Sequence, residues 1–226
     1  MTDWLYTASI WVLPLLFAIT FHEAAHGFAA LWFGDDTAAR LGRVSANPLR
    51  HVDPFGTVVL PGILLITHAP FLFGWAKPVP VNFWRLHPQR LGMILVAAAG
   101  PATNLVLALA SALLIYPTLA MSPWLGEWVG HNLLNSVRIN IVLAVFNMLP
   151  IPPLDGGRVA VGILPRFLAE PLARMERLGI LVLLGALFLL PMIGNQLGMN
   201  LDVFSAIVGG PAEFLEDLLF RATGLI

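Results

Sequence analysis

The feature that most constrains this chain is His22-Glu23-Ala24-Ala25-His26, which lies inside an apolar run at about residues 4–33. Ionisable side chains near the centre of a bilayer cost about 2.5–3.5 kcal/mol each, so their presence in such a run needs a chemical reason. In an α-helix, positions i and i+4 share one face, so His22 and His26 can bind one metal ion. Glu23 follows the first histidine and can act as a general base on a metal-bound water, as in the HExxH pattern of zinc hydrolases.

The composition indicates a polytopic membrane protein. Of the 226 residues, 58% are hydrophobic and only 11% are charged, whereas a soluble domain carries about 25% charged residues. The formal net charge of −1 offers no basic surface for nucleic acid. The chain has no cysteine, so any metal must be bound by His, Asp or Glu. The N-terminus lacks the positively charged region of a signal peptide, and we expect the first run to be a retained transmembrane helix.

Four apolar segments predict membrane spans, at about residues 4–33, 91–116, 132–149 and 178–193. The polar segment 35–54 contains Arg40, Val44 and several Gly, Asn and Pro residues, and it predicts a small β-hairpin at the membrane surface. An irregular loop is the alternative there. Segment 202–220 mixes apolar residues with carboxylates and predicts an interfacial amphipathic helix or a weak last span.

Segment 55–76 carries no charge but is interrupted by glycines and prolines. Basic residues flank it on both sides, and the positive-inside rule therefore places both flanks in the cytoplasm. We expect a re-entrant segment that lines a wet cavity, because irregular backbone at membrane depth requires such a setting. The N-terminus is then outside, and the active site lies toward the cytoplasmic side.

These segments predict an all-α polytopic membrane protein, a bundle of about four to six transmembrane helices with a re-entrant segment and a small membrane-surface β-hairpin. We expect one integral-membrane domain over residues 1–226. Its catalytic core would cover about residues 4–165, and accessory helices would cover about residues 172–224.

A catalytic zinc takes about three protein ligands and keeps one position open. Asp155 is the best candidate for the third ligand, because it follows a proline-rich break at the end of a span and precedes two glycines. Simpler roles remain open for several residues. Asp155 could cap a helix, Asn147 could form an interhelical hydrogen bond, and the Gly100-Pro101-x-x-Asn104 stretch could be a kink for close packing. His51 or His68 could contact a metal ligand without binding the metal itself.

The two motifs, His22–His26 and Asn147-Met148-Leu149-Pro150-Ile151-Pro152-Pro153-Leu154-Asp155-Gly156, resemble those of the site-2 protease family of intramembrane zinc metalloproteases. The stretch Phe73-Gly74-Trp75-Ala76-Lys77-Pro78-Val79-Pro80-Val81-Asn82 and the Gly100–Asn104 stretch resemble the compact bacterial and archaeal branch. The resemblance covers about residues 17–158. The chain departs from larger members, since we find no PDZ-like insertion, no nucleotide-binding CBS tail and no span before the HExxH helix.

The resemblance implies that His22, His26 and Asp155 bind one Zn²⁺ and that Glu23 activates water and passes its proton to the leaving amine. Asn147 would help to hold the substrate backbone or the developing oxyanion. An unwound substrate could add as a strand to residues 78–83 or to the edge of the predicted hairpin at residues 40–44.

The function implied is a zinc-dependent endopeptidase that cleaves membrane proteins in or near a transmembrane segment, in regulated intramembrane proteolysis. Its partners would be transmembrane substrates and the lipid bilayer, without nucleic acid, in a prokaryotic plasma (inner) membrane. A metal or ion transporter and a catalytically silent scaffold are the alternatives. A transporter is expected to show an internal repeat, and we find none. A silent scaffold is expected to have lost Glu23 or a ligand, and all of these are present.

Overall fold

The computed structural model describes residues 2–59, 63, 76–199 and 201–226, and within these ranges every regular element is a helix. The predicted all-α class is therefore confirmed for the described residues. The α-helices and the 3₁₀- or π-helical turns (η) are α1 (Thr2–Trp32), α2 (Thr37–Arg40), η1 (Pro48–Arg50), η2 (Pro54–Val59), η3 (Phe83–Arg85), α4 (Gln89–Thr118), α5 (Pro123–Asn147), α6 (Asp155–Ile163), α7 (Arg166–Arg174), α8 (Glu176–Leu184), η4 (Gly185–Leu189), α9 (Leu190–Gln196), η5 (Ser205–Gly209) and α10 (Gly210–Thr223).

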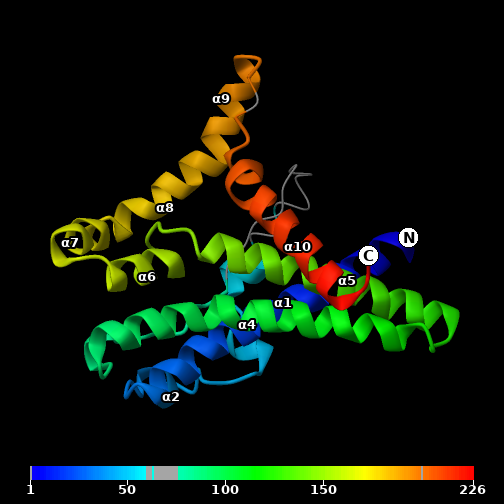
Figure 1. Ribbon diagram of the computed structural model, residues 1–226, viewed down its shortest axis with the longest axis horizontal. Helices are drawn as coiled ribbons and strands as arrows, with labels where there is room; N and C mark the ends of the chain where they lie inside the picture. Colours follow the sequence, from blue (N-terminus) through cyan, green and yellow to red (C-terminus); the bar gives the residue numbers. More distant parts are fainter. Residues whose placement is uncertain (1, 60–62, 64–75, 200) are drawn as a thin grey trace.

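Among the described residues, three helices are long and apolar enough to cross a membrane, and they lie side by side (Figure 1). They are Trp4–Trp32 in α1, Gln89–Thr118 in α4 and Pro123–Asn147 in α5. Each of the three packs against the other two. A further apolar stretch, Leu181–Gly194, is shorter. The number of spans expected from the sequence, four to six, therefore remains a prediction.

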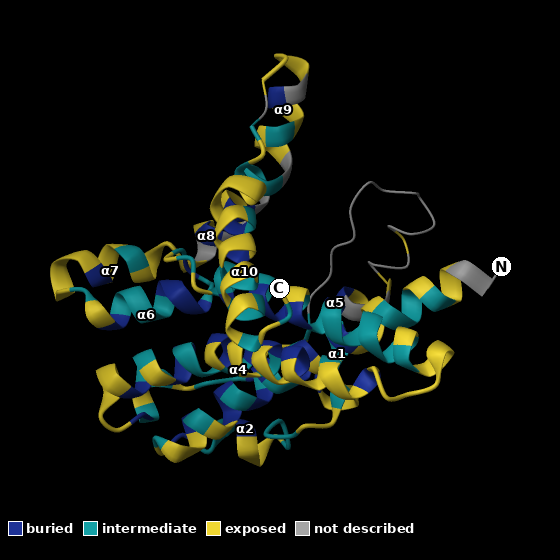
Figure 2. Ribbon diagram, turned by 45° about the vertical axis from the view of Figure 1, so that its right-hand side comes forward, coloured by how far each residue is buried: buried dark blue, intermediate teal, exposed yellow. Residues whose placement is uncertain are grey.

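Small residues line the contacts between the long helices. Helices in lipid associate through close backbone approach, which small side chains permit. Large apolar side chains are exposed on the outer faces, where lipid would cover them (Figure 2). The fully buried small residues on these helices include Ala18, Ala30, Ala108 and Ala112.

The predicted β-hairpin is wrong. Residues 37–40 form the short helix α2, Gly42 takes a left-handed turn with φ of 64°, and η1 follows at Pro48. The physical reason is that side chains satisfy this backbone locally. Asp35 Oδ1 accepts the Thr37 N–H at 3.0 Å, and Arg50 Nη1 donates to the Gly42 carbonyl at 2.6 Å. No ladder of strand hydrogen bonds is then needed.

Three other predicted segments, at residues 132–149, 55–76 and 202–220, can be compared with the structure. The predicted span at residues 132–149 begins earlier, because α5 starts at Pro123, whose fixed φ suits the first turn of a helix. The predicted re-entrant segment at residues 55–76 lies mostly outside the described residues. Toward the C-terminus, η5 and α10 are helical as predicted for residues 202–220, and α10 packs against α4 and α5.

Candidate metal centre

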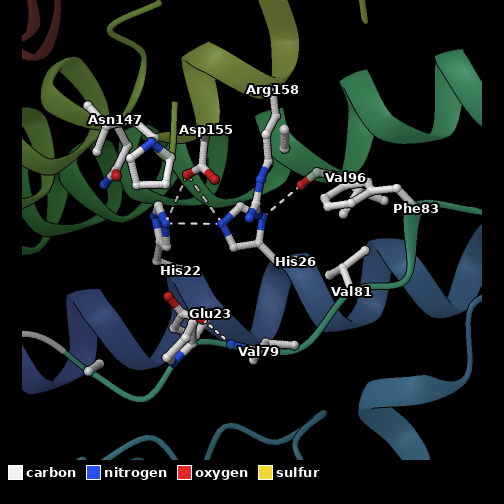
Figure 3. A pocket seen from close by; sticks show the side chains of 15 residues that line it. His22, Glu23, His26, Val79, Val81, Phe83, Val96, Asn147, Asp155 and Arg158 are labelled. Carbon is white, nitrogen blue, oxygen red and sulfur yellow. Dashed lines mark hydrogen bonds and ion pairs between the residues drawn. The ribbon is translucent and has the colours of Figure 1, made fainter. Parts of the chain in front are cut away.

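His22, His26 and Asp155 meet in the interior of the helix bundle. The Nε2 atoms of His22 and His26, one turn apart on α1, lie 3.1 Å from each other. Asp155 Oδ2 lies 3.2 Å from the first of these atoms and 3.3 Å from the second (Figure 3). Each of the three residues is only 7% exposed. The structure thus brings together the three residues that the sequence singled out as candidate ligands.

A tight turn between α5 and α6 places Asp155 next to the two histidines. The chain reverses after Asn147, and Asp155 is the first residue of α6, which packs against α4. A Cβ atom at Gly156 would lie 2.2 Å from the Met148 carbonyl oxygen, so only glycine allows this reversal. The N-cap position belongs to Leu154, and the Asp155 carboxylate points instead at the histidines.

The orientation of both imidazoles is fixed by their Nδ1 atoms. His26 Nδ1 lies 2.7 Å from the Val96 carbonyl oxygen, and His22 Nδ1 lies 2.6 Å from Asn104 Oδ1. A carbonyl oxygen can only accept, so each Nδ1 must carry a hydrogen. A neutral imidazole has one N–H, and both Nε2 atoms therefore present a lone pair to the same point.

This donor set fits a divalent metal ion. With both imidazoles neutral, two lone pairs and a carboxylate oxygen converge without a hydrogen to share, and Asp155 Oδ2 is buried without a hydrogen-bond donor among the described residues. A buried cluster of this kind is unfavourable alone and becomes favourable when it binds a cation. Two histidines and one carboxylate with an open position form a common catalytic zinc set.

Gly100 of α4 leaves the space beside these lone pairs. A Cβ atom there would lie 2.5 Å from His26 Nε2 and 2.7 Å from His22 Nε2. From the sequence alone, close packing of helices is one possible role of the Gly100–Asn104 stretch. In the structure, the close approach at Gly100 is to the two histidines.

A cavity of about 400 Å³ opens onto the centre (Figure 3). Besides the three candidate ligands, its polar lining consists of Glu23, Asn147 and Arg158. One amide N–H of Asn147 donates to the Leu143 carbonyl at 3.0 Å, which leaves the second N–H for the predicted role. The guanidinium of Arg158 lies 4.9 Å from the centre of the Phe83 ring.

An extended segment, residues 76–82, lies along the same cavity, and we refer to it as the strap. Its Val79 N–H donates to Glu23 Oε2 at 2.7 Å, and its Asn82 N–H donates to buried Asp35 Oδ2 at 2.6 Å. The Lys77 N–H donates to the His51 carbonyl at 2.9 Å. The strap is therefore tied to α1 and to the loop that follows it.

The contacts of Asn104 and of the strap do not follow from the sequence. The sequence leaves Asn104 open between close packing and a functional role, although an amide in the middle of an apolar span is itself a signal of a buried hydrogen-bond partner. The strap was recognised as extended, but its bond to Glu23 was not foreseen. Of the two histidines proposed as supporting residues, His51 anchors the strap and does not line the 400 Å³ cavity. His68 lies outside the described residues.

The sequence is similar to those of known proteins. The chain is 36% identical over 207 residues to "Putative zinc metalloprotease YwhC" of Bacillus subtilis, a match that covers 87% of this chain and 91% of YwhC. Residues 127–191 match the profile described as Peptidase family M50. The chain belongs to peptidase family M50. The profile match includes Asn147, Asp155 and Arg158, whereas His22 and His26 lie outside it.

Other relatives are matched over shorter stretches. "Putative zinc metalloprotease Rip2" of Mycobacterium tuberculosis is 34% identical over 145 residues, which are 62% of this chain and 52% of Rip2. "Putative zinc metalloprotease MJ0611" of Methanocaldococcus jannaschii is 42% identical over 76 residues, which are 33% of this chain and 35% of MJ0611. The chain thus spans about half of Rip2. No solved structure gives a significant match.

Proposed function

We propose that this M50 peptidase is a zinc-dependent endopeptidase that cleaves membrane proteins in or near a transmembrane segment. The observation that carries the proposal is the convergence of three candidate ligand atoms, from His22, His26 and Asp155. They converge within a bundle of helices that are long and apolar enough to cross a membrane. The names of YwhC, Rip2 and MJ0611 support zinc as the metal.

The polar side chains that line the cavity, apart from Arg158, each have a chemical role in this proposal. The two histidines and Asp155 would bind zinc, which supplies Lewis acidity and lowers the pKa of a water molecule. Glu23, which lines the same cavity, accepts a proton from that water and delivers it to the leaving amine. Asn147 has one N–H left to donate to the substrate carbonyl oxygen as negative charge develops there.

The depth of the centre in the bundle supports cleavage inside the membrane. Gly100, which faces the centre, is the twelfth of the 30 residues in α4. At 1.5 Å per residue, the centre lies about 17 Å from the start of that helix, whereas a hydrocarbon core is about 30 Å thick. In the orientation that we propose, the N-terminus is outside, the centre faces the cytoplasmic side and the membrane is a prokaryotic plasma membrane.

The strap offers the substrate an extended partner. A peptide bond in a helix is shielded and hydrogen-bonded, so the substrate must unwind before it is cleaved. The Val79 and Asn82 N–H groups already donate to carboxylates, whereas the Val81 N–H donates to no group among the described residues. We propose that the backbone of Val81, which lines the cavity, pairs with the unwound substrate.

The experiment that tests the proposal compares wild type with Glu23→Gln. Each protein is purified in detergent, its bound zinc is measured, and its cleavage of a transmembrane peptide is assayed. We expect about one zinc per chain in both proteins and cleavage by wild type alone. Zinc in both without cleavage of transmembrane substrates would favour the transporter or scaffold alternatives. Equal cleavage by both would refute the role of Glu23.

A further inference from the structure

A chain of buried polar side chains leads from His22 through all three long helices. Asn104 on α4 is 0% exposed and Asn140 on α5 is 1% exposed. Asn104 Oδ1 lies 2.6 Å from His22 Nδ1, and Asn104 Nδ2 donates to Asn140 Oδ1 at 2.8 Å. Asn140 Nδ2 in turn donates to the Ser136 carbonyl at 2.8 Å. Polar side chains this deep in apolar helices need partners, and here each amide has them.

Two backbone carbonyls fix the direction of this chain. The Ser136 carbonyl can only accept, so the amide nitrogen of Asn140 faces it and the amide oxygen of Asn140 faces Asn104. Asn104 must then donate through its nitrogen, which also lies 3.3 Å from the Ala18 carbonyl of α1. The oxygen of Asn104 is therefore the atom that faces His22. Neither amide can be reversed without placing two acceptors against each other.

The consequence is a fixed tautomer for His22. With the Asn104 oxygen as its partner, Nδ1 must hold the hydrogen, and Nε2 keeps its lone pair for the metal. His26 reaches the same state through the Val96 backbone carbonyl, which a side-chain substitution leaves in place. Replacing Asn104 thus removes the hydrogen-bond partner of His22 and leaves that of His26 in place.

We propose that Asn104, held by Asn140, is a positioning residue that sets the tautomer and ring orientation of His22 for metal binding. This inference rests on the proposed role of His22 as a ligand. Groups that orient a metal-binding histidine typically contribute about 10–100-fold to metal affinity. A hydrogen bond that merely joined α4 to α5 would contribute to stability and nothing to metal affinity. Zinc affinity therefore separates the two roles.

The test measures the zinc dissociation constant of the purified full chain in detergent, by competition with a fluorescent chelator. Asn104→Leu removes the acceptor at similar volume, and we expect zinc binding to weaken about 10–100-fold. Asn104→Asp retains an acceptor for Nδ1–H and, in its protonated form, a donor for Asn140 Oδ1, and we expect its affinity to lie closer to that of wild type than to that of the leucine variant. Asn135→Leu breaks a 2.8 Å bond from α5 to the Ile10 carbonyl of α1 that is not part of this chain of side chains, and we expect wild-type affinity.

The possible outcomes separate the inference from the proposed function. A folded Asn104→Leu protein that binds zinc as tightly as wild type overturns the inference. If that variant does not fold, Asn140→Leu replaces it, because it leaves only the Ala18 carbonyl at 3.3 Å to orient the Asn104 amide, and wild-type affinity in that protein overturns the role given to Asn140. A wild-type chain that binds no zinc, or binds it equally well after His22→Ala, refutes the proposed function itself.

Discussion

The carboxylate of Glu23 accepts the backbone N–H of Val79 at 2.7 Å, so the candidate base is tied to the strap that borders the cavity. Prolines precede and follow Val79, and the strap residues Pro78 and Pro80 have no N–H to offer. Val79 is therefore the residue that can supply this hydrogen bond at this point of the strap. The bond fixes one oxygen of Glu23 and leaves the other for proton transfer.

Removing that N–H is expected to impair cleavage without affecting the metal. Val79→Pro deletes the donor, and hydrogen bonds to charged groups contribute about 1.5–3 kcal/mol. We expect at least a tenfold lower cleavage rate, about 1.4 kcal/mol, with unchanged zinc content. Val79→Ala is the control, because it shortens the buried side chain and keeps the N–H. Equal rates in the two variants would show that the hydrogen bond does not position Glu23.

Gly100→Ala is expected to give a folded protein that does not bind zinc. The added methyl would lie 2.5 Å from His26 Nε2 and fill the space that the lone pairs face, so the histidine rings must shift. Alanine is a better helix former than glycine by about 1 kcal/mol, which offsets part of the about 1–3 kcal/mol that such overpacking costs.

Zinc content and the thermal unfolding temperature of the Gly100→Ala protein test this prediction. Gly185→Ala is the matched control in another helix, where the nearest atom, Leu189 Cδ1, is 4.0 Å from the added carbon. Full zinc occupancy in Gly100→Ala would contradict the proposed position of the metal.

The sequence predicted the candidate centre because helical geometry determines it. Two histidines four residues apart in an apolar run share a face in any α-helix. Asp155 was found because a proline-rich break followed by two glycines marks a turn at the end of a span, and a carboxylate there needs a partner. These inferences depend on local spacing and on the cost of burial.

The unpredicted features depend on how the helices are rotated against one another. Asn104 could have faced either neighbouring helix, and its bond to His22 follows only from the packing of α4 on α1. The predicted hairpin failed for a local reason, since Asp35 and Arg50 satisfy backbone groups that a strand would have paired. The alternating prolines predict an extended strap. The contact of its Val79 with Glu23 joins residues that are 56 positions apart in the sequence.

Asp35→Ala is expected to destabilise the protein far more than Asp36→Ala. Asp35 is 0% exposed and accepts N–H groups from Thr37 and Asn82, and an unsatisfied buried N–H costs about 1–3 kcal/mol. Asp36 forms more exposed ion pairs with Arg40 and Arg85, and such pairs contribute about 0–1 kcal/mol. Thermal unfolding in detergent measures the difference. Similar losses in both variants would show that Asp35 does not anchor the strap.

Asp155→Asn is expected to separate stability from metal binding. In the zinc-free protein, the new amide N–H can donate to a histidine Nε2 only 3.2–3.3 Å away, which relieves the convergence of three acceptors. We expect the zinc-free variant to be at least as stable as zinc-free wild type.

Zinc at 100 times its dissociation constant stabilises a binding protein by about 2.7 kcal/mol, and only wild type should show this gain. Thermal unfolding after chelator treatment, with and without added zinc, measures both effects. An equal zinc-dependent gain in the two proteins would exclude Asp155 as a ligand.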